Sequence, residues 1–445
     1  MQDLDRYTKS RIEQTLSALS GLTIYSGIKT DPVLSELRGI LLAIVSSETD
    51  NAGIPHAASK STLPYELTEK YSLIYSLLLR DKLSDVPDLG EYVLALVQND
   101  DNLFTRAASG RGTATETNDL KISPEMRLCV INDLMRIETI ASFPSRVLTS
   151  MLAPVTAIPL PEWRHNPADQ SPVTLFESLL TYHREKSFGV FSKYHAFIWK
   201  SNSLEPVERP DPIRLDQLFE YEYEISQVLE NTRRLIRHKH ADNLLLFGAR
   251  GTGKSSAVKA VANACMDQGL RLIEVDKDEL LTIADLLAYL SELSGVGLSF
   301  ILFLDDLSFA EEDTRYTILK TLLEGGVKIR PDHVAIYATS NRRHLVAEKE
   351  SKELYANDAS DEKLSLSDRF GISIRFQSPN QQTYLQIVYG ILKDRGVTFE
   401  EEVVSGKALS WAMRENGRSP RSARQFADYY EATCENTSVP STVKE

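Results

Sequence analysis

Apolar and polar residues alternate differently in the two halves of the chain. In the first half, apolar side chains recur every three or four residues, which is the spacing of an amphipathic helix. Two groups show this spacing: Tyr71, Ile74, Leu77 and Leu78, and Leu128, Ile131, Leu134 and Met135. Ser123 and Pro124 precede the second group and predict a helix start, since serine caps free backbone N–H groups and proline fits the first turn. These patterns predict a mostly helical amino-terminal domain over residues 1–203.

Three segments depart from this helical pattern. The polar stretch 105–119 predicts a loop, and the aromatic-rich stretch 188–199 fits either a strand or a buried helix. Residues 204–212 contain three prolines. Because proline lacks a backbone donor and disfavours helix in the residue before it, we expect an extended linker over 204–212.

After this linker, short apolar segments alternate with helical patterns, which is typical of a parallel sheet covered on both faces. The strand candidates are 243–247, 271–275, 300–304, 334–338 and 372–376. From about residue 378 the pattern is purely helical, with Gly396 and Gly417 placed as helix stops. We predict an α/β core with a parallel five-stranded sheet over 213–377, a helical lid over 378–434 and a polar tail over 435–445.

The strongest chemical signal directly follows the first strand candidate of this core. The run Gly248-Ala249-Arg250-Gly251-Thr252-Gly253-Lys254-Ser255 matches the P-loop pattern G-x-x-x-x-G-K-[ST] at every fixed position, and a helical pattern follows it. In such a loop backbone N–H groups turn towards phosphates, lysine reaches the β- and γ-phosphates, and the hydroxyl binds Mg²⁺. We expect ATP and Mg²⁺ to bind here, with Ser256 completing the nucleotide site, Lys254 acting in catalysis and Ser255 as a metal ligand.

Two carboxylates end the apolar strand candidate 300–304. In a protein with a P-loop, this is the expected Mg²⁺ site, with Asp305 holding the metal through water and Asp306 orienting or deprotonating the attacking water. An acid at a strand end also commonly caps the turn that follows, and for Asp306 this alternative stays open.

Composition and charge exclude some classes of protein. The chain has 445 residues, enough for two or three domains, and its 42% hydrophobic and 25% charged residues are ordinary globular values. No apolar stretch approaches the roughly 20 residues of a membrane span. Acids near the amino terminus and three scattered cysteines favour a cytoplasmic protein. The net charge of −13 does not indicate nucleic-acid binding, although a local basic groove is compatible with it.

From about Pro212 to Tyr430 the chain resembles an AAA+ ATPase module, because further motifs follow in the order of that superfamily. Residues 339–341 resemble sensor 1, residues 367–371 the arginine-finger segment and residues 417–424 sensor 2. The resemblance implies that Asn341 contacts the γ-phosphate and the attacking water. It also implies that Arg369 reaches the nucleotide of a neighbouring subunit, and that Arg421 faces the nucleotide from the lid.

Four runs are similar to a bacterial family of predicted AAA+ ATPases catalogued as a domain of unknown function: residues 251–256, 304–309, 338–345 and 364–371. This resemblance implies a homo-oligomer, as a ring or an arc. The Asp305–Asp306 pair resembles the initiator and helicase-loader branch, which implies slow, switch-like hydrolysis.

Two functions fit these features. The first is an ATPase that remodels or loads a protein or protein–nucleic-acid partner, which the amino-terminal half selects; the alternative is an ATP-gated binding scaffold with little hydrolysis. The basic run 233–240 at a helix end is more often solvated than bound to nucleic acid. Arg424 could assist Arg421, though a helical arginine is more often an exposed ion-pair partner.

Overall fold

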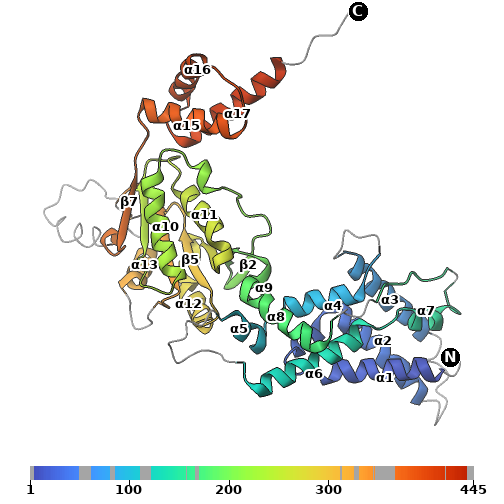
Figure 1. The fold of residues 1–445 in the computed structure, drawn as a ribbon. Helices are drawn as coiled ribbons and strands as arrows, with labels where there is room; N and C mark the ends of the chain where they lie inside the picture. The colour runs from blue at the N-terminus through green and yellow to red at the C-terminus, as the bar shows by residue number, and fades with distance from the viewer. Residues whose placement is uncertain are drawn as a thin grey trace, which may run out of the picture. The chain divides into compact units, whose positions relative to one another are not determined.

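The computed structural model describes residues 5–49, 62–80, 86–110, 122–156, 158–165, 170–310, 313–324, 330–343, 345, 366–415 and 417–437. The chain forms two compact units (Figure 1). The first comprises Met1–Lys193 with Gly295–Gly297, and the second comprises Tyr194–Ser294 and Leu298–Glu445. None of the helices in the described ranges is long and apolar enough to span a membrane.

The first unit is helical, as predicted. Its α-helices are α1 (Arg6–Gly21), α2 (Pro32–Thr49), α3 (Leu63–Arg80), α4 (Leu89–Gln98), α5 (Leu103–Ser109), α6 (Pro124–Ala141), α7 (Arg146–Leu152), α8 (Pro172–Lys186) and α9 (Gly189–Lys193). Helices α1 to α8 share one apolar core, in which Tyr71, Ile74 and Leu78 of α3 are buried. The predicted start of α6 is confirmed, because the Ser123 side chain accepts from the backbone N–H of Met126.

The four apolar residues whose spacing predicts α6 are only partly buried. Leu134 is buried, but Leu128 and Met135 are 61% and 50% exposed. The buried face instead includes Asp133, whose carboxylate accepts from the backbone N–H groups of Thr23 and Tyr25. The carboxylate of Asp133 is buried because its hydrogen bonds are satisfied within the core. Apolar spacing alone therefore does not identify the residues of α6 that are buried.

The loop prediction for 105–119 is wrong at its beginning. Thr105–Ser109 are helical in α5, where Asn102 forms a capping box with Thr105. Such a box satisfies two backbone donors reciprocally and fixes a helix start inside a polar sequence. Residues 111–119 lie outside the described part of the chain.

The sheet of the second unit has seven strands in the order β2-β1-β4-β5-β6-β3-β7, rather than the five expected. The expected strands appear within two residues of their predicted bounds as β3 (Leu244–Gly248), β4 (Leu270–Val275), β5 (Ser299–Leu304), β6 (Val334–Ser340) and β7 (Ile372–Phe376), all parallel. The α/β class with a parallel sheet is therefore confirmed.

The two additional strands are β1 (Ala196–Lys200) and β2 (Ser203–Pro206), which form an antiparallel hairpin. The predicted boundary after residue 203 and the linker 204–212 are therefore wrong in part, because 204–206 belong to β2. Ser201 and Asn202 have positive φ values of 50° and 60°, as a two-residue hairpin turn requires. Pro206 is tolerated because it ends an edge strand. The aromatic stretch 188–199 contains both a helix, α9, and a strand, β1.

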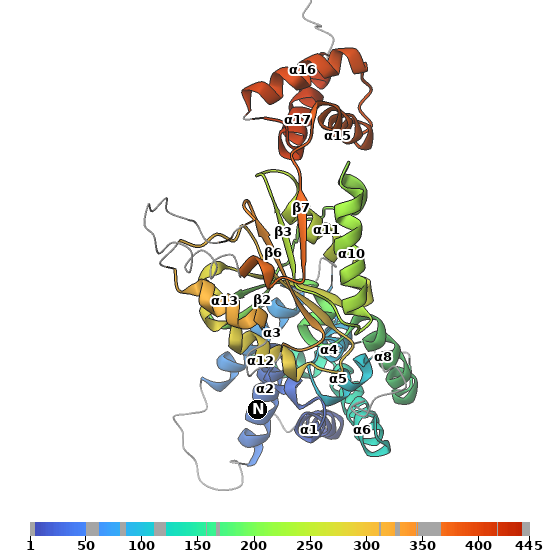
Figure 2. The same cartoon turned by 90° about the vertical axis from the view of Figure 1, so that its left-hand side faces the viewer.

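Helices cover both faces of this sheet (Figure 2). On one face, α10 (Glu222–Ile236) and α11 (Lys254–Cys265) pack against alternate residues of the strands, such as Ile301 and Phe303 of β5. On the other face lie α12 (Ile283–Glu292) and α13 (Arg315–Glu324). Strands β5 and β6 are buried along their whole length, so they form the centre of the core.

The predicted helical lid is present as α15 (Gln381–Asp394), α16 (Glu401–Arg414) and α17 (Pro420–Thr437). Gly396 and Gly417, with φ values of 72° and 110°, follow the ends of α15 and α16 in the left-handed conformation expected of helix stops. Helix α17 continues three residues past the predicted lid boundary, and residues 438–445 lie outside the described ranges.

Trp199 tests the assignment of β1 to the seven-stranded sheet. Its side chain is buried, and its indole N–H donates to the Thr282 hydroxyl at 2.9 Å. Trp199→Ala should lower the free energy of unfolding of the second unit by about 3–5 kcal/mol, because it leaves a large cavity. Urea denaturation followed by circular dichroism measures this, with the exposed aromatic Tyr223→Ala as control. Equal, small effects of both changes would contradict the assignment.

Candidate functional site

The P-loop joins β3 to α11, and its glycines adopt backbone conformations that other residues rarely reach. Gly248, Gly251 and Gly253 have φ values of 148°, 75° and 92°. A Cβ atom on Gly248 would lie 2.0 Å from the Phe376 carbonyl oxygen of β7. These glycines therefore allow a tight loop at the amino terminus of α11, which is a favourable place for an anion.

Lys254 is the first residue of α11 and is only 6% exposed. Its amine donates to the carbonyl oxygens of Gly248 and Ala249 at 2.9 and 2.8 Å, and to the Asn341 Oδ1 at 3.3 Å. Burial lowers the pKa of the amine, whereas Asp306 and Asp305 act to raise it. Neutral oxygens compensate a buried cation only partly, so this amine favours an incoming anion.

A chain of hydrogen bonds links α11, β5 and β6. The Ser255 hydroxyl and the Thr339 hydroxyl both donate to Asp305 Oδ1, at 2.6 and 2.5 Å. The backbone N–H of Asp306 in turn donates to the Thr339 hydroxyl at 2.8 Å. Hydroxyl and carboxylate oxygens are the ligands that Mg²⁺ prefers, so Ser255 and Asp305 could hold that ion.

Asp306 lies just beyond β5 with a φ of 50°, in the left-handed region that aspartate tolerates better than most residues. Its carboxylate accepts from the Asn341 side-chain amide at 2.5 Å. The contact that the structure gives for the Asp306 carboxylate is thus with Asn341, directly after the nearby strand β6. It is not a cap on the turn that follows Asp306. Asp306 and Asn341 can therefore hold a water molecule between an acceptor and a donor.

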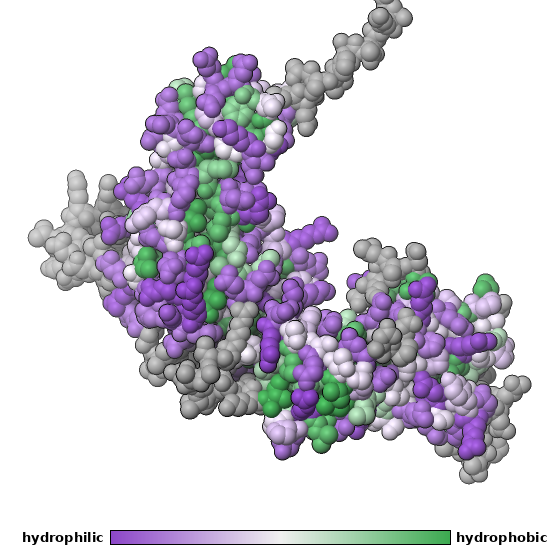
Figure 3. Space-filling view, in the orientation of Figure 1, coloured by the Kyte–Doolittle hydropathy of each residue, from purple (hydrophilic) through white to green (hydrophobic). Residues whose placement is uncertain are grey.

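A cavity of about 700 Å³ joins these groups to the lid. One end is polar, with P-loop residues 250–256, both aspartates, Thr339 and Asn341. The other end is apolar, lined by Leu218, Phe219, Tyr221, Ile225, Phe376, Ile387 and Ile391. On the surface, apolar side chains form a band from the lid over α10 and α11 (Figure 3). Such a division suits a ligand with a flat apolar part and an anionic part.

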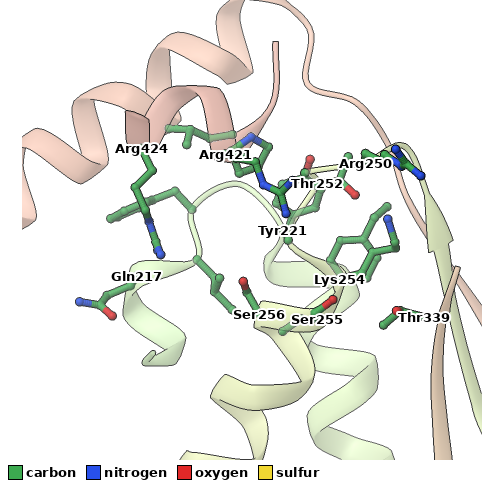
Figure 4. A pocket seen from close by; sticks show the side chains of 18 of the residues that line it. Gln217, Tyr221, Arg250, Thr252, Lys254, Ser255, Ser256, Thr339, Arg421 and Arg424 are labelled. Carbon is green, nitrogen blue, oxygen red and sulfur yellow. The ribbon is translucent and has the colours of Figure 1, made fainter. Parts of the chain in front are cut away.

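The lid contributes two arginines to this cavity, Arg421 and Arg424 of α17 (Figure 4). The predicted start of α17 is confirmed, because the Ser419 hydroxyl accepts from the backbone N–H of Ser422 at 3.1 Å. The backbone N–H of Arg421 donates to the Gly251 carbonyl at 3.2 Å, so the lid contacts the P-loop directly. A Cβ atom on Gly251 would lie 3.1 Å from both Arg421 Cβ and Ser419 Oγ.

Arg369 is not among the residues that line the cavity. Arg369 precedes β7, whose first residue, Ile372, pairs with Leu244 at the start of β3. The P-loop follows the other end of β3, so Arg369 lies at the opposite ends of the strands. Its guanidinium forms an ion pair with Glu324 of α13 at 2.9 Å. Between Arg369 and β7, Gly371 passes so close to Asp242 that an added Cβ would lie 2.5 Å from its Oδ1.

The other predicted site residues come together. Arg250, Gly251, Thr252, Gly253, Lys254, Ser255, Ser256, Asp305, Asp306, Asn341 and Arg421 line the cavity, while Gly248 and Ala249 supply carbonyls to Lys254. Sequence reasoning gave no role to Thr339 or to the apolar end. The strand register explains the role of Thr339: Leu304 pairs with Ala338, so Thr339 lies beside Asp305. This register is a property of the structure and has no local signal in the sequence.

Four features define a P-loop protein of the AAA+ type: the P-loop between the parallel strand β3 and α11, the acids at the end of β5, the polar end of β6 and the helical lid. The chain belongs to the family described as "Protein of unknown function (DUF815)", whose sequence profile matches residues 192–434. No curated protein matches the chain.

Among solved structures, the chain is similar to the Thermotoga maritima RuvB Holliday junction branch migration motor. The identity is 17% and the TM-score is 0.34, over 51% of this chain and 66% of the RuvB chain. A mutant of the same protein aligns with 17% identity and a TM-score of 0.36, over 51% of this chain and 67% of the other. The alignment with the first of these thus spans slightly less than two thirds of the RuvB chain.

Thr339→Val tests the hydrogen-bond chain at the strand ends. Valine keeps the shape but removes the hydroxyl that donates to Asp305 and accepts from Asp306. Loss of a group that orients a metal ligand typically weakens metal affinity by about 10–100-fold, so the Mg²⁺ concentration needed for half-maximal nucleotide binding should rise. Thr321→Val, on the exposed face of α13, is the matched control. An unchanged Mg²⁺ requirement would remove Thr339 from the site.

Proposed function

We propose that this protein binds ATP with Mg²⁺ and hydrolyses it in order to remodel or load a protein or protein–nucleic-acid partner. One observation carries the proposal: Lys254, the Ser255–Asp305 pair and the Asp306–Asn341 pair converge from three chain segments at one end of a single cavity. Cation, metal ligands and water-holding groups are the parts that phosphoryl transfer requires.

The shape of the cavity supports ATP as the ligand. Its apolar end offers contacts for a purine base at Leu218 and Phe219, which line the cavity and are partly exposed. At the polar end, Lys254 and Arg421 would meet the triphosphate. Bound Mg²⁺ would neutralise phosphate charge, with Ser255 and Asp305 as its protein ligands.

The Asp306 carboxylate is the proposed proton acceptor for hydrolysis. The oxygen of water bonds to the γ-phosphorus, the bond from that phosphorus to the β–γ bridging oxygen breaks, and the water proton passes to Asp306. Asn341 would hold Asp306 and the water in position. This role requires Asp306 to exchange its bond with Asn341 for one with water.

That same bond favours slow hydrolysis. The Asp306 carboxylate must give up its bond with Asn341 before it can accept from water, and aspartate reaches less far than glutamate. This observation supports the second candidate, an ATP-gated scaffold with little turnover. Phosphate release by the purified protein, with and without DNA, distinguishes the two, since turnover at background favours the scaffold.

The remaining parts of the proposal concern assembly and partners. We propose a cytoplasmic homo-oligomer, as a ring or arc, in which Arg369 reaches the neighbouring subunit's nucleotide. The helical first unit would select the protein partner. Arg233, Arg237 and Lys239 are exposed at the end of α10 and are the available basic contacts if nucleic acid takes part.

Two variants separate binding from turnover. Lys254→Ala should abolish measurable ATP binding, because it removes the cation of the phosphate site. Asp306→Asn should retain ATP and Mg²⁺ but lower turnover by roughly 10²–10⁴-fold, because an amide cannot accept the proton. Calorimetry and phosphate release measure the two effects. ATP affinity of wild-type strength in Lys254→Ala would contradict the site, and wild-type turnover in Asp306→Asn would contradict the role of Asp306.

A mixing experiment tests Arg369. Arg369→Ala should bind ATP normally yet lose roughly 10³–10⁵ in turnover if the arginine acts as a finger. Mixing it with Lys254→Ala should restore part of the activity, since an interface can pair one intact P-loop with one intact arginine. Glu324→Gln is the control, because it breaks the internal ion pair while keeping Arg369. If Glu324→Gln is as inactive as Arg369→Ala and mixing restores nothing, Arg369 is structural.

A further inference from the structure

One face of α17 is turned to the nucleotide cavity along two helical turns. Arg421, Arg424, Gln425 and Asp428 all line the cavity, at the spacing i, i+3, i+4 and i+7 of a single helix face. The opposite stripe, including Ala423, Phe426 and Ala427, is buried in the lid core. The orientation of α17 is thus fixed by packing, and its polar face is held over the cavity.

Arg424 has no hydrogen-bond or ion-pair partner within the described part of the chain, although an acid stands one turn further on. Arg424 and Asp428 are four residues apart, the spacing at which opposite charges usually pair on a helix. Asp428 instead pairs with Arg395 at 2.5 Å, and Arg395 also binds Glu431 at 2.9 Å. Because Asp428 is paired with Arg395, it does not form the ion pair that would hold Arg424 away from the cavity.

The two lid arginines lie at different places along the cavity (Figure 4). Arg421 is next to Gly251 of the P-loop, on the side of Lys254, whereas Arg424 is on the side of Ser256 and Gln217. Three residues of helix separate them by about 4.5 Å along the axis, which is comparable to the length of a triphosphate. An arginine has donors only, so the exposed side chain of Arg424 can donate to an acceptor on a ligand bound in the cavity.

We propose that Arg424 binds the α-phosphate of the nucleotide, while Arg421 serves the phosphates nearer Lys254. This inference rests on the proposed function, since it requires a nucleotide in the cavity. The Gln217 amide does not compete for the same group, because its oxygen accepts from the backbone N–H of Arg214 and its nitrogen donates to Asp394. Arg424 thus binds the part of the ligand that AMP, ADP and ATP share.

Affinities for AMP, ADP and ATP test the proposal, with AMP measured by competition against a fluorescent nucleotide. Arg424→Ala should weaken all three by a similar factor, roughly 10–100-fold for a lost charge-assisted hydrogen bond, and should leave adenosine unchanged. Arg424→Lys should recover part of the loss. Arg421→Ala should weaken ATP more than AMP. Arg414→Ala, an exposed arginine outside the cavity, is the matched control and should change none of them.

A second variant tests the same idea without touching Arg424. Arg395→Ala releases Asp428 to pair with Arg424, so it should also weaken all three nucleotides, and Asp428→Asn added to Arg395→Ala should restore them. An Arg424→Ala protein that binds like wild type, or loses ATP more than AMP, would overturn the inference while Lys254→Ala still abolishes ATP binding. A wild-type protein that binds no nucleotide would overturn the proposed function itself.

Discussion

The parallel pairing of β3, β5 and β6 is the constraint on which the candidate site depends. Parallel strands end at the same edge, so the P-loop after β3, the aspartates after β5 and Thr339 with Asn341 at the end of β6 meet there. Neighbouring strands lie about 4.8 Å apart, which is within reach of one short side chain and its hydrogen bond. The direct contact of Thr339 with Asp305 follows from that spacing, whereas Ser255 reaches Asp305 from the first turn of α11.

How much could be predicted from the sequence depended on how local each feature is. The strands β3 to β7 are short segments rich in apolar residues, and the P-loop is a contiguous motif, so both were predictable. The hairpin β1–β2 was not, since the prolines after it resemble a linker and nothing local shows that β1 pairs with β4. On α6, the burial of Asp133 was not predictable because the partners of its carboxylate lie far away in the sequence.

The site shows the same limit. The apolar end of the cavity is assembled from the segment before α10, from β7 and from the lid, and no spacing rule connects these segments. Arg424 is a second example, because a helical arginine with an acid four residues later is expected to be paired. Only the structure reveals that Arg395, from the end of α15, already holds that acid.

Strand β7 gives the second unit a mechanical property. It is five residues long, about 16 Å at the usual rise of a strand, and it runs from the Arg369 segment to the first glycine of the P-loop. Both of its ends are close-packed, at Gly371 against Asp242 and at Phe376 against Gly248, where not even a methyl group fits. A strand held so tightly at both ends cannot absorb a displacement by local repacking. In the proposed oligomer, a displacement of Arg369 by a neighbouring subunit would therefore be transmitted along β7 to the P-loop.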